Sequence, residues 1–212
     1  MSKLPRSFYM RDDVLQITRE LLGKFLVTRF RDVITSGMIT EAEAYAGVID
    51  SASHAHKGRR TNRTEIMYAT GGTAYVYLCY GVHHLFNVVT NEKDIPHAIL
   101  IRGLEPVEGI EVMLRRRKMK ALSPSLTSGP GSLSKALDIQ VKHTGTDLLG
   151  DKIWIEDRGV KIPSSKIVRT KRIGVEYAGE HAHLPYRFII KGNKWITKSP
   201  FIKSESGNLK TR

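Results

Sequence analysis

The sequence predicts a mixed α+β fold with a largely antiparallel sheet, and three observations lead to this class. Strand-like and helix-like segments do not alternate in a regular βαβ order, which argues against a doubly wound parallel sheet. Two β-rich runs flank a short glycine-containing turn, the pattern of a hairpin. The 212 residues contain no internal repeat and no linker. We therefore expect one domain over residues 1–202 and a polar, flexible C-terminal tail over residues 203–212.

The first predicted element is an amphipathic helix. Asp12 or Asp13 can cap it, apolar residues recur at helical spacing from Val14 to Leu22, and Gly23 can end it. β-branched and aromatic runs then predict strands, with the hairpin turn near Tyr80-Gly81-Val82. The predicted strands cover residues 25–30, 33–45, 74–80, 85–90, 98–102, 153–155, 171–177 and 187–191, and polar loops cover 47–62 and 123–132.

Two further helices are predicted in the second half of the chain. One covers residues 106–120, with Pro106 in its first turn and with Val107, Ile110 and Leu114 facing the core. The other is a short helix that Ser132 caps and that ends at Ile139.

The charge balance points to a polyanionic partner. The chain has 34 Lys and Arg against 21 Asp and Glu, a formal net charge of +13, and a domain this basic usually meets nucleic acid. From charge alone, the alternatives are a ribosomal or RNA-binding protein, or a soluble enzyme that is merely basic. There is no apolar run of about 18 residues and no signal-peptide pattern, so we expect a soluble, intracellular protein with no membrane contact, in the cytoplasm or nucleoid if the host is bacterial. The single cysteine, Cys79, excludes an intrachain disulfide and a cysteine-based zinc site.

Two carboxylates and an aromatic residue share one face of the predicted strand 33–45. A period of two places Glu41, Glu43 and Tyr45 together, with small residues on the opposite face. A carboxylate in such a place can activate water for the hydrolysis of a glycosidic bond. By spacing alone, however, an edge strand with solvated acids is the favoured interpretation, because glutamate is usually exposed.

A run of tyrosines precedes the hairpin turn. Tyr75, Tyr77 and Cys79 lie on one side of the predicted strand, and Tyr80 lies on the other side near the turn. Flat side chains can grip a base that has been flipped out of a duplex, and a wedge can fill the space it leaves. The alternative is that tyrosine is simply a good strand former.

Histidines and a basic segment complete the candidates. His54, His56, His83 and His84 have no carboxylate or cysteine at the spacing of a zinc site, so we expect no bound metal. The segment Lys57–Arg63 mixes cations with hydroxyl and amide groups, which suits phosphate oxygens or a solvated loop. No phosphate-binding loop and no nucleophile elbow is present, which excludes nucleotide hydrolysis and serine-based hydrolysis.

Taken in order, these motifs resemble the alkyladenine (3-methyladenine) DNA glycosylases. The resemblance extends from about Phe8 to Trp195. The matched segments are Thr40–Tyr45, His54, Arg63–Tyr68, Gly72–Gly81, Asn87, Leu100–Pro106, Ser128–Pro130, Arg172–Val175 and Ala178–Glu180. It implies one mixed domain around a curved antiparallel sheet with a protruding β-hairpin. It also implies a repair enzyme that flips alkylated or deaminated purines out of double-stranded DNA and hydrolyses the N-glycosidic bond, leaving an abasic site.

The resemblance also implies a role for individual residues. Glu43 is the general base and Arg102 holds both Glu43 and the attacking water. Tyr80 is the wedge at the hairpin tip. The base pocket is formed by Tyr45, His54, Tyr77 and Asn87, and the DNA backbone is contacted by Arg59, Thr61 and Tyr75. No role is implied for Glu41, and the protein is expected to act as a monomer without metal or organic cofactor.

Two other functions compete with this interpretation. A nucleic-acid-binding module without catalysis explains the charge and the tyrosines, but not a carboxylate beside an aromatic pocket. A bifunctional glycosylase-lyase needs a lysine nucleophile, and no lysine lies in an apolar strand that would lower its pKa. We therefore expect a monofunctional enzyme.

Overall fold

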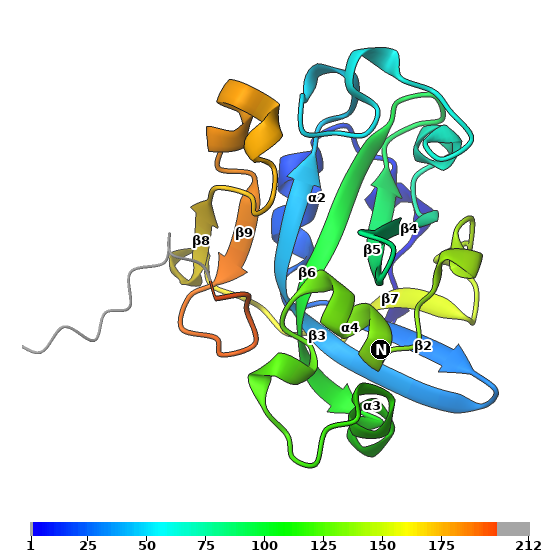
Figure 1. The fold of residues 1–212 in the computed structure, drawn as a ribbon, viewed down its shortest axis with the longest axis vertical. Coiled ribbons are helices and arrows are strands. Elements are labelled where there is room, and N and C mark those ends of the chain that lie inside the picture. Colours follow the sequence, from blue (N-terminus) through cyan, green and yellow to red (C-terminus); the bar gives the residue numbers. More distant parts are fainter. Residues whose placement is uncertain (1, 199–212) are drawn as a thin grey trace, which may run out of the picture.

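A nine-stranded antiparallel sheet organises the computed structural model, which describes residues 2–198 (Figure 1). The sheet order is β1-β7-β2-β3-β6-β5-β4, while β9 pairs with β3 and β8 pairs with β9. The sheet curls into a half-barrel, so the predicted α+β class with a curved antiparallel sheet is confirmed. The predicted tail over residues 203–212 lies outside the described residues. The strands are β1 (Ser2–Lys3), β2 (Phe25–Phe30), β3 (Val33–Tyr45), β4 (Ala74–Cys79), β5 (His83–Thr90), β6 (His97–Glu108), β7 (Ile153–Asp157), β8 (Ile167–Thr170) and β9 (Arg187–Ile190).

Strand β3 holds the sheet together because it has three partners. Its first part pairs with β2, as in Phe25↔Met38, and its last part pairs with β9 from Glu41 to Glu43. Along its other edge it pairs with β6. The β3–β6 register shifts on both sides of Glu41, and such bulges bend a strand and re-aim its side chains. The strand carrying both glutamates is therefore interior to the sheet.

The helices are short. The α-helices are α1 (Arg6–Tyr9), α2 (Val14–Leu21), α3 (Ile110–Arg117) and α4 (Pro130–Ala136). Asp13 caps α2 by accepting from the backbone N–H groups of Leu15 and Gln16, and Gly23 follows with a φ of +85°, so the first predicted helix is confirmed. Every helix in the described part of the chain is too short or insufficiently apolar to span a bilayer.

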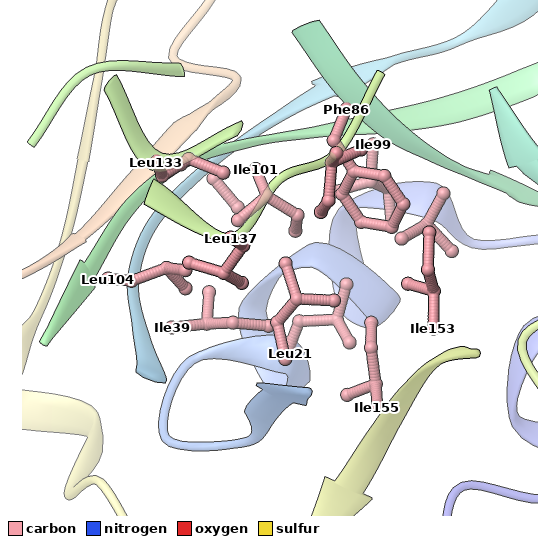
Figure 2. Packing of buried hydrophobic residues seen from close by; sticks show 14 of the residues in the cluster. Leu21, Ile39, Phe86, Ile99, Ile101, Leu104, Leu133, Leu137, Ile153 and Ile155 are labelled. Atoms are coloured by element: carbon pink, nitrogen blue, oxygen red, sulfur yellow. The ribbon is translucent and has the colours of Figure 1, made fainter. Parts of the chain in front are cut away.

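One apolar cluster lies inside the curl of the sheet. Leu21 of α2 and Leu133 and Leu137 of the α4 region meet strand side chains such as Ile101 and Ile155 there (Figure 2). All five side chains are completely buried. At about 25 cal/mol per Å² of apolar surface removed from water, packing of this kind supplies the main favourable free energy of the fold. The cluster fixes β3, β5 and β6 relative to one another, and these strands carry much of the candidate site.

The hairpin is confirmed, whereas three predicted elements are wrong. Strands β4 and β5 pair from Ala74↔Val88 to Cys79↔His83, which leaves residues 80–82 as the turn. The predicted helix over 106–120 begins too early, because Pro106 and Val107 still belong to β6. Val107 is 44% exposed and does not face the core. Pro106 lies opposite Gly37 where the β3–β6 register is irregular, a place where a strand tolerates proline.

The other two corrections concern the second half of the chain. Helix α4 begins at Pro130, whose fixed φ suits a first helical position, so Ser132 lies inside the helix and does not cap it. Residues 171–175 form no strand; β8 ends at Thr170, and a 3-10 helix, η7, covers Glu176–His183. The backbone of 171–175 turns inward to the site, as described next.

Candidate active site

A cavity of about 780 Å³ opens between the β4–β5 hairpin, β6, α4 and the segment preceding η7. Most of the predicted site residues line it: Tyr45, His54, Tyr75, Tyr77, Tyr80, Asn87 and Arg102. Glu43, Arg59 and Thr61 do not. The fold thus brings together residues that are far apart in the sequence.

Glu43 lies directly behind the wall of this cavity. Its side chain is completely buried, and its Oε2 accepts a hydrogen bond of 2.9 Å from the Tyr45 hydroxyl. The backbone N–H of Ile173 donates to Oε1 at 2.9 Å. Arg102 lies 3.3 Å from Oε1 and 3.4 Å from Oε2. Because Tyr45, Arg102 and Ile173 all line the cavity, one layer of groups separates the carboxylate from it.

The interpretation of these acids as solvated groups on an edge strand is wrong. Both Glu41 and Glu43 are completely buried on an interior strand. An isolated buried carboxylate is costly, and here arginines compensate the charge. Burial alone would lower the pKa of Arg102, but the carboxylates of Glu43 and Glu41 raise it above its ordinary value. Arg102 is therefore a permanent cation between two glutamates.

Three aromatic rings form one wall of the cavity. His54 meets Tyr77 edge-on, with ring centroids 4.7 Å apart, and its Nδ1 lies 2.9 Å from the Tyr75 hydroxyl. Burial lowers the pKa of His54 to about 4, and the nearby Arg63 and Arg59 cations lower it as well. His54 is therefore neutral at physiological pH and can act as a hydrogen-bonding group but not as a charged one.

Tyr45 also lines the cavity, and a buried ion pair supports its ring. The guanidinium of Arg172 lies over the Tyr45 ring at 4.8 Å and pairs with Asp50, donating to Oδ1 at 2.8 Å. Burial raises the pKa of Tyr45, and the neighbouring Glu43 charge raises it further. The phenol therefore stays protonated and donates to Glu43.

Asn87 lies on β5, opposite Tyr75 of β4, and is buried. It is 4% exposed, and its amide nitrogen donates to the backbone carbonyls of Tyr75 (3.1 Å) and Leu85 (3.2 Å). These bonds fix the orientation of the amide within the cavity lining.

Tyr80 stands at the tip of the hairpin with 91% of its surface exposed. Its φ is +50°, an unusual backbone conformation for a bulky residue. Val82 beside it is 70% exposed. An aromatic and an aliphatic side chain thus project from the turn and are largely exposed.

The three residues predicted to contact the DNA backbone occupy different environments. Arg59 and Thr61 are exposed. Tyr75 is only 2% exposed and its hydroxyl meets His54, so it forms part of the cavity wall. Of these three residues, only Arg59 and Thr61 are exposed at the protein surface in this structure.

Comparisons with known proteins agree with this geometry. The family model described as methylpurine-DNA glycosylase matches residues 7–194. The chain belongs to that family. A relative from Chlamydia felis is 44% identical over 192 residues, covering 90% of this chain and 97% of its own. One from Clostridium acetobutylicum is 45% identical over 202 residues, covering 92% and 97%. Both are named as inferred 3-methyladenine DNA glycosylases.

The protein is accordingly a DNA glycosylase, a hydrolase of N-glycosyl bonds that acts on DNA with damaged bases. Among the described residues of this glycosylase, no three His, Cys, Asp or Glu side chains gather in a way that could hold a metal ion. The site is built from carboxylates, arginines and aromatic rings.

Three parts of the glycosylase site were missed by sequence reasoning. The backbone N–H of Ile173 has no side-chain signal, since any residue type carries it. Arg172 fell within a matched segment, but nothing in its neighbourhood indicated the pairing with Asp50, which is 122 positions away. Arg187 pairs with Glu41 from 146 positions away. An arginine inside an otherwise apolar run, Tyr186–Ile190, was the available signal that this residue is buried with a partner.

Proposed function

We propose that this glycosylase acts as a monomer on double-stranded DNA, flips an alkylated or deaminated purine into the cavity, and hydrolyses its N-glycosidic bond with water activated by Glu43. The observation that carries the proposal is the buried Glu43–Arg102 pair, directly behind a cavity walled by Tyr45, His54 and Tyr77. A module that only bound nucleic acid would have no use for a buried carboxylate at the base of an aromatic pocket.

Glu43 suits the role of general base. The water would approach from the cavity beside Arg102, whose contacts of 3.3 and 3.4 Å with Glu43 are long and so the easiest to rearrange. The water proton would pass to the carboxylate as the water oxygen bonds to C1′. The bond between C1′ and the base nitrogen breaks, and its electron pair leaves with the base. Until it takes up this proton, the negative charge of the Glu43 carboxylate would favour an oxocarbenium-like transition state.

The hairpin suits the role of opening the duplex. Flipping a base costs a few kcal/mol, and less where pairing is already damaged. Tyr80, at 91% exposure, would enter the minor groove and occupy the gap in the stack. The flipped purine would lie against the rings of Tyr45 and Tyr77, and stacking of this kind contributes roughly 1–3 kcal/mol per base.

Positively charged purines would be the better substrates. A purine methylated at N3 or N7 leaves as a neutral base and needs no proton. A deaminated purine such as hypoxanthine is a poorer leaving group and would need a proton donor, and His54, with its pKa lowered to about 4, does not provide one at neutral pH. We therefore propose alkylated purines as the main substrates and deaminated purines as slower ones.

The proposed function is tested by product analysis. Duplexes containing one 3-methyladenine, 7-methylguanine, hypoxanthine or ethenoadenine should release the free base, methylated purines fastest, and leave an intact strand that breaks only after alkali. Strand cleavage without alkali would replace the monofunctional mechanism with a lyase. If the protein bound all four duplexes but released no base, it would be a DNA-binding module without catalytic activity.

The DNA backbone is proposed to follow a basic groove that adjoins the cavity. A second cavity of about 520 Å³ shares Arg116, Asp138 and Gln140 with the first. Its lining also includes four cations, Arg29, Arg31, Lys142 and Lys152. Within residues 2–198 none of these four forms an ion pair with a carboxylate within 4.0 Å. Cations without carboxylate partners are available for phosphates.

We expect the double variant Arg29→Gln/Lys142→Gln to weaken binding to undamaged duplex and to reduce the slope of log affinity against log salt by about 0.9 for each lost phosphate contact. Fluorescence anisotropy over a salt series measures this. Lys161→Gln/Lys166→Gln is the matched control, because both lysines are exposed and neither lines the two cavities. Equal slopes for the two double variants would place the DNA elsewhere.

A further inference from the structure

Glu41 lies two residues from Glu43 on β3, but its partners are different. Its Oε1 accepts hydrogen bonds from Nε of Arg102 at 3.0 Å and from Nε of Arg187 at 2.7 Å. Its Oε2 accepts from the backbone N–H of Thr197. Glu41 and Arg187 are completely buried, and neither lines the cavity. Glu41 does not reach the cavity, so it can influence the reaction only through the position of Arg102 or through its own charge.

Arg102 connects the two glutamates. Its Nε faces Glu41 at 3.0 Å, while its Nη1 reaches Oε2 of Glu43 at 3.4 Å. A guanidinium is a rigid planar fork, so fixing the position of Nε sets the direction of the other nitrogens. Glu41 is in turn anchored by Arg187 on β9 and by Thr197. The orientation of Arg102 in the cavity wall is therefore set from the C-terminal part of the chain.

We propose that Glu41 and Arg187 are positioning residues. They keep the Arg102 guanidinium from pairing more closely with Glu43 than the observed 3.3–3.4 Å, and they keep the buried cluster of two glutamates and two arginines electrically neutral. The inference rests on the proposed role of Glu43 as the base. Two carboxylates and two guanidiniums balance in this cluster. Without Glu41, Arg102 would have Glu43 as its only carboxylate partner and would pair with it closely. The paired oxygen would then be less able to take a proton from water.

Other charged and titratable groups also face Glu43. Tyr45 from β3 donates to it, and Arg172 and Tyr177, from the segment that enters and begins η7, lie within electrostatic range. Arg172 is itself neutralised by Asp50. All of these groups are the same in every variant considered below, so a displaced pH–rate profile would arise from the change at position 41 or 187.

Two variants that each remove one charge are expected to shift the pH–rate profile in opposite directions. Glu41→Gln leaves a net positive charge beside Glu43, which favours its ionised form, so the acidic limb of the single-turnover pH–rate profile moves to lower pH. Arg187→Gln leaves a net negative charge, and the limb moves to higher pH. In both variants the rate constant at neutral pH falls roughly 10–100-fold, as expected for a displaced catalytic group, while affinity for the lesion duplex is unchanged.

Glu41→Asp separates orientation from charge. It keeps the negative charge but withdraws the carboxylate from Arg102. The acidic limb of the pH–rate profile should therefore stay in place while the single-turnover rate constant falls. This variant also decides the matter if a charge-removing variant fails to fold, because a wild-type rate constant in Glu41→Asp would overturn the proposal. Folded fractions are compared by thermal melting. Lower melting temperatures with unmoved limbs in Glu41→Gln and Arg187→Gln would show a purely structural role. Failure of the proposed function itself is recognised separately, by excision that persists in Glu43→Gln.

Discussion

Replacing Glu43 with glutamine is expected to lower the single-turnover rate constant for base release by roughly 10²–10⁴-fold, the contribution of a general base, with little loss of affinity for lesion DNA. Glutamine has the same shape and can still accept from the backbone N–H of Ile173, and Arg102 keeps Glu41 as a partner. The fold should therefore persist, while the group that takes the proton from water is lost. Rapid-quench assays on a duplex containing 7-methylguanine measure the effect.

Glu156→Gln is the matched control for this variant. Glu156 is also a largely buried glutamate of the sheet. It lies on β7 and pairs with Arg158, just after the end of that strand. It does not line the cavity. We expect Glu156→Gln to change thermal stability but not the rate constant for base release. Near-normal excision by Glu43→Gln would exclude Glu43 as the base, and an equal loss in both variants would indicate a general effect of removing a buried charge.

Tyr80→Ala is expected to reduce excision from duplex DNA by roughly 5–150-fold at subsaturating enzyme, equivalent to the 1–3 kcal/mol of a base-stacking contact. The side chain is 91% exposed at the turn of the hairpin, so its removal costs the folded protein almost no packing. What is lost is the ring that fills the gap left by the flipped base. Fluorescence of a 2-aminopurine placed beside the lesion reports the unstacking directly.

Two comparisons make the Tyr80 prediction specific. Tyr80→Phe retains the ring and the strained backbone position, with φ of +50°, and should behave like the unchanged protein. A lesion opposite a mismatched base costs less to flip, so the defect of Tyr80→Ala should shrink on that substrate. A defect of the same size on paired and mismatched lesions would show that Tyr80 acts on binding rather than on flipping.

Local chemistry was sufficient to predict much of the fold. The ranges of β2 and β3 and the β4–β5 hairpin follow from β-branched and aromatic runs broken by turn residues. The start of α2 follows from a capping aspartate. The predictions failed where tertiary pairing overrode local preference. Pro106 looked like a helix start, but a register irregularity between β3 and β6 accommodates it in a strand.

The candidate site was predicted in part. The resemblance identified Tyr45, His54, Tyr77 and Arg102 as partners, and these side chains do line one cavity. Tyr75 was predicted to meet DNA phosphates, which remains a prediction; its side chain is buried in the cavity wall and its hydroxyl lies 2.9 Å from Nδ1 of His54. Residue type indicates what a side chain can do, whereas its solvent exposure depends on which segments pack over it.

By itself, the sequence determined the α+β class, the basic charge, the main strands and the residue types that hydrolysis of a glycosidic bond requires. Only the tertiary structure decided which groups surround each glutamate. Glu41 and Glu43 are equivalent in strand spacing, and both are buried by β6 and β9. They differ because β9 brings Arg187 to Glu41, while the segment before η7 brings the N–H of Ile173 to Glu43. The physical reason is that a buried carboxylate is defined by the partners that replace its water, and those partners come from distant parts of the chain.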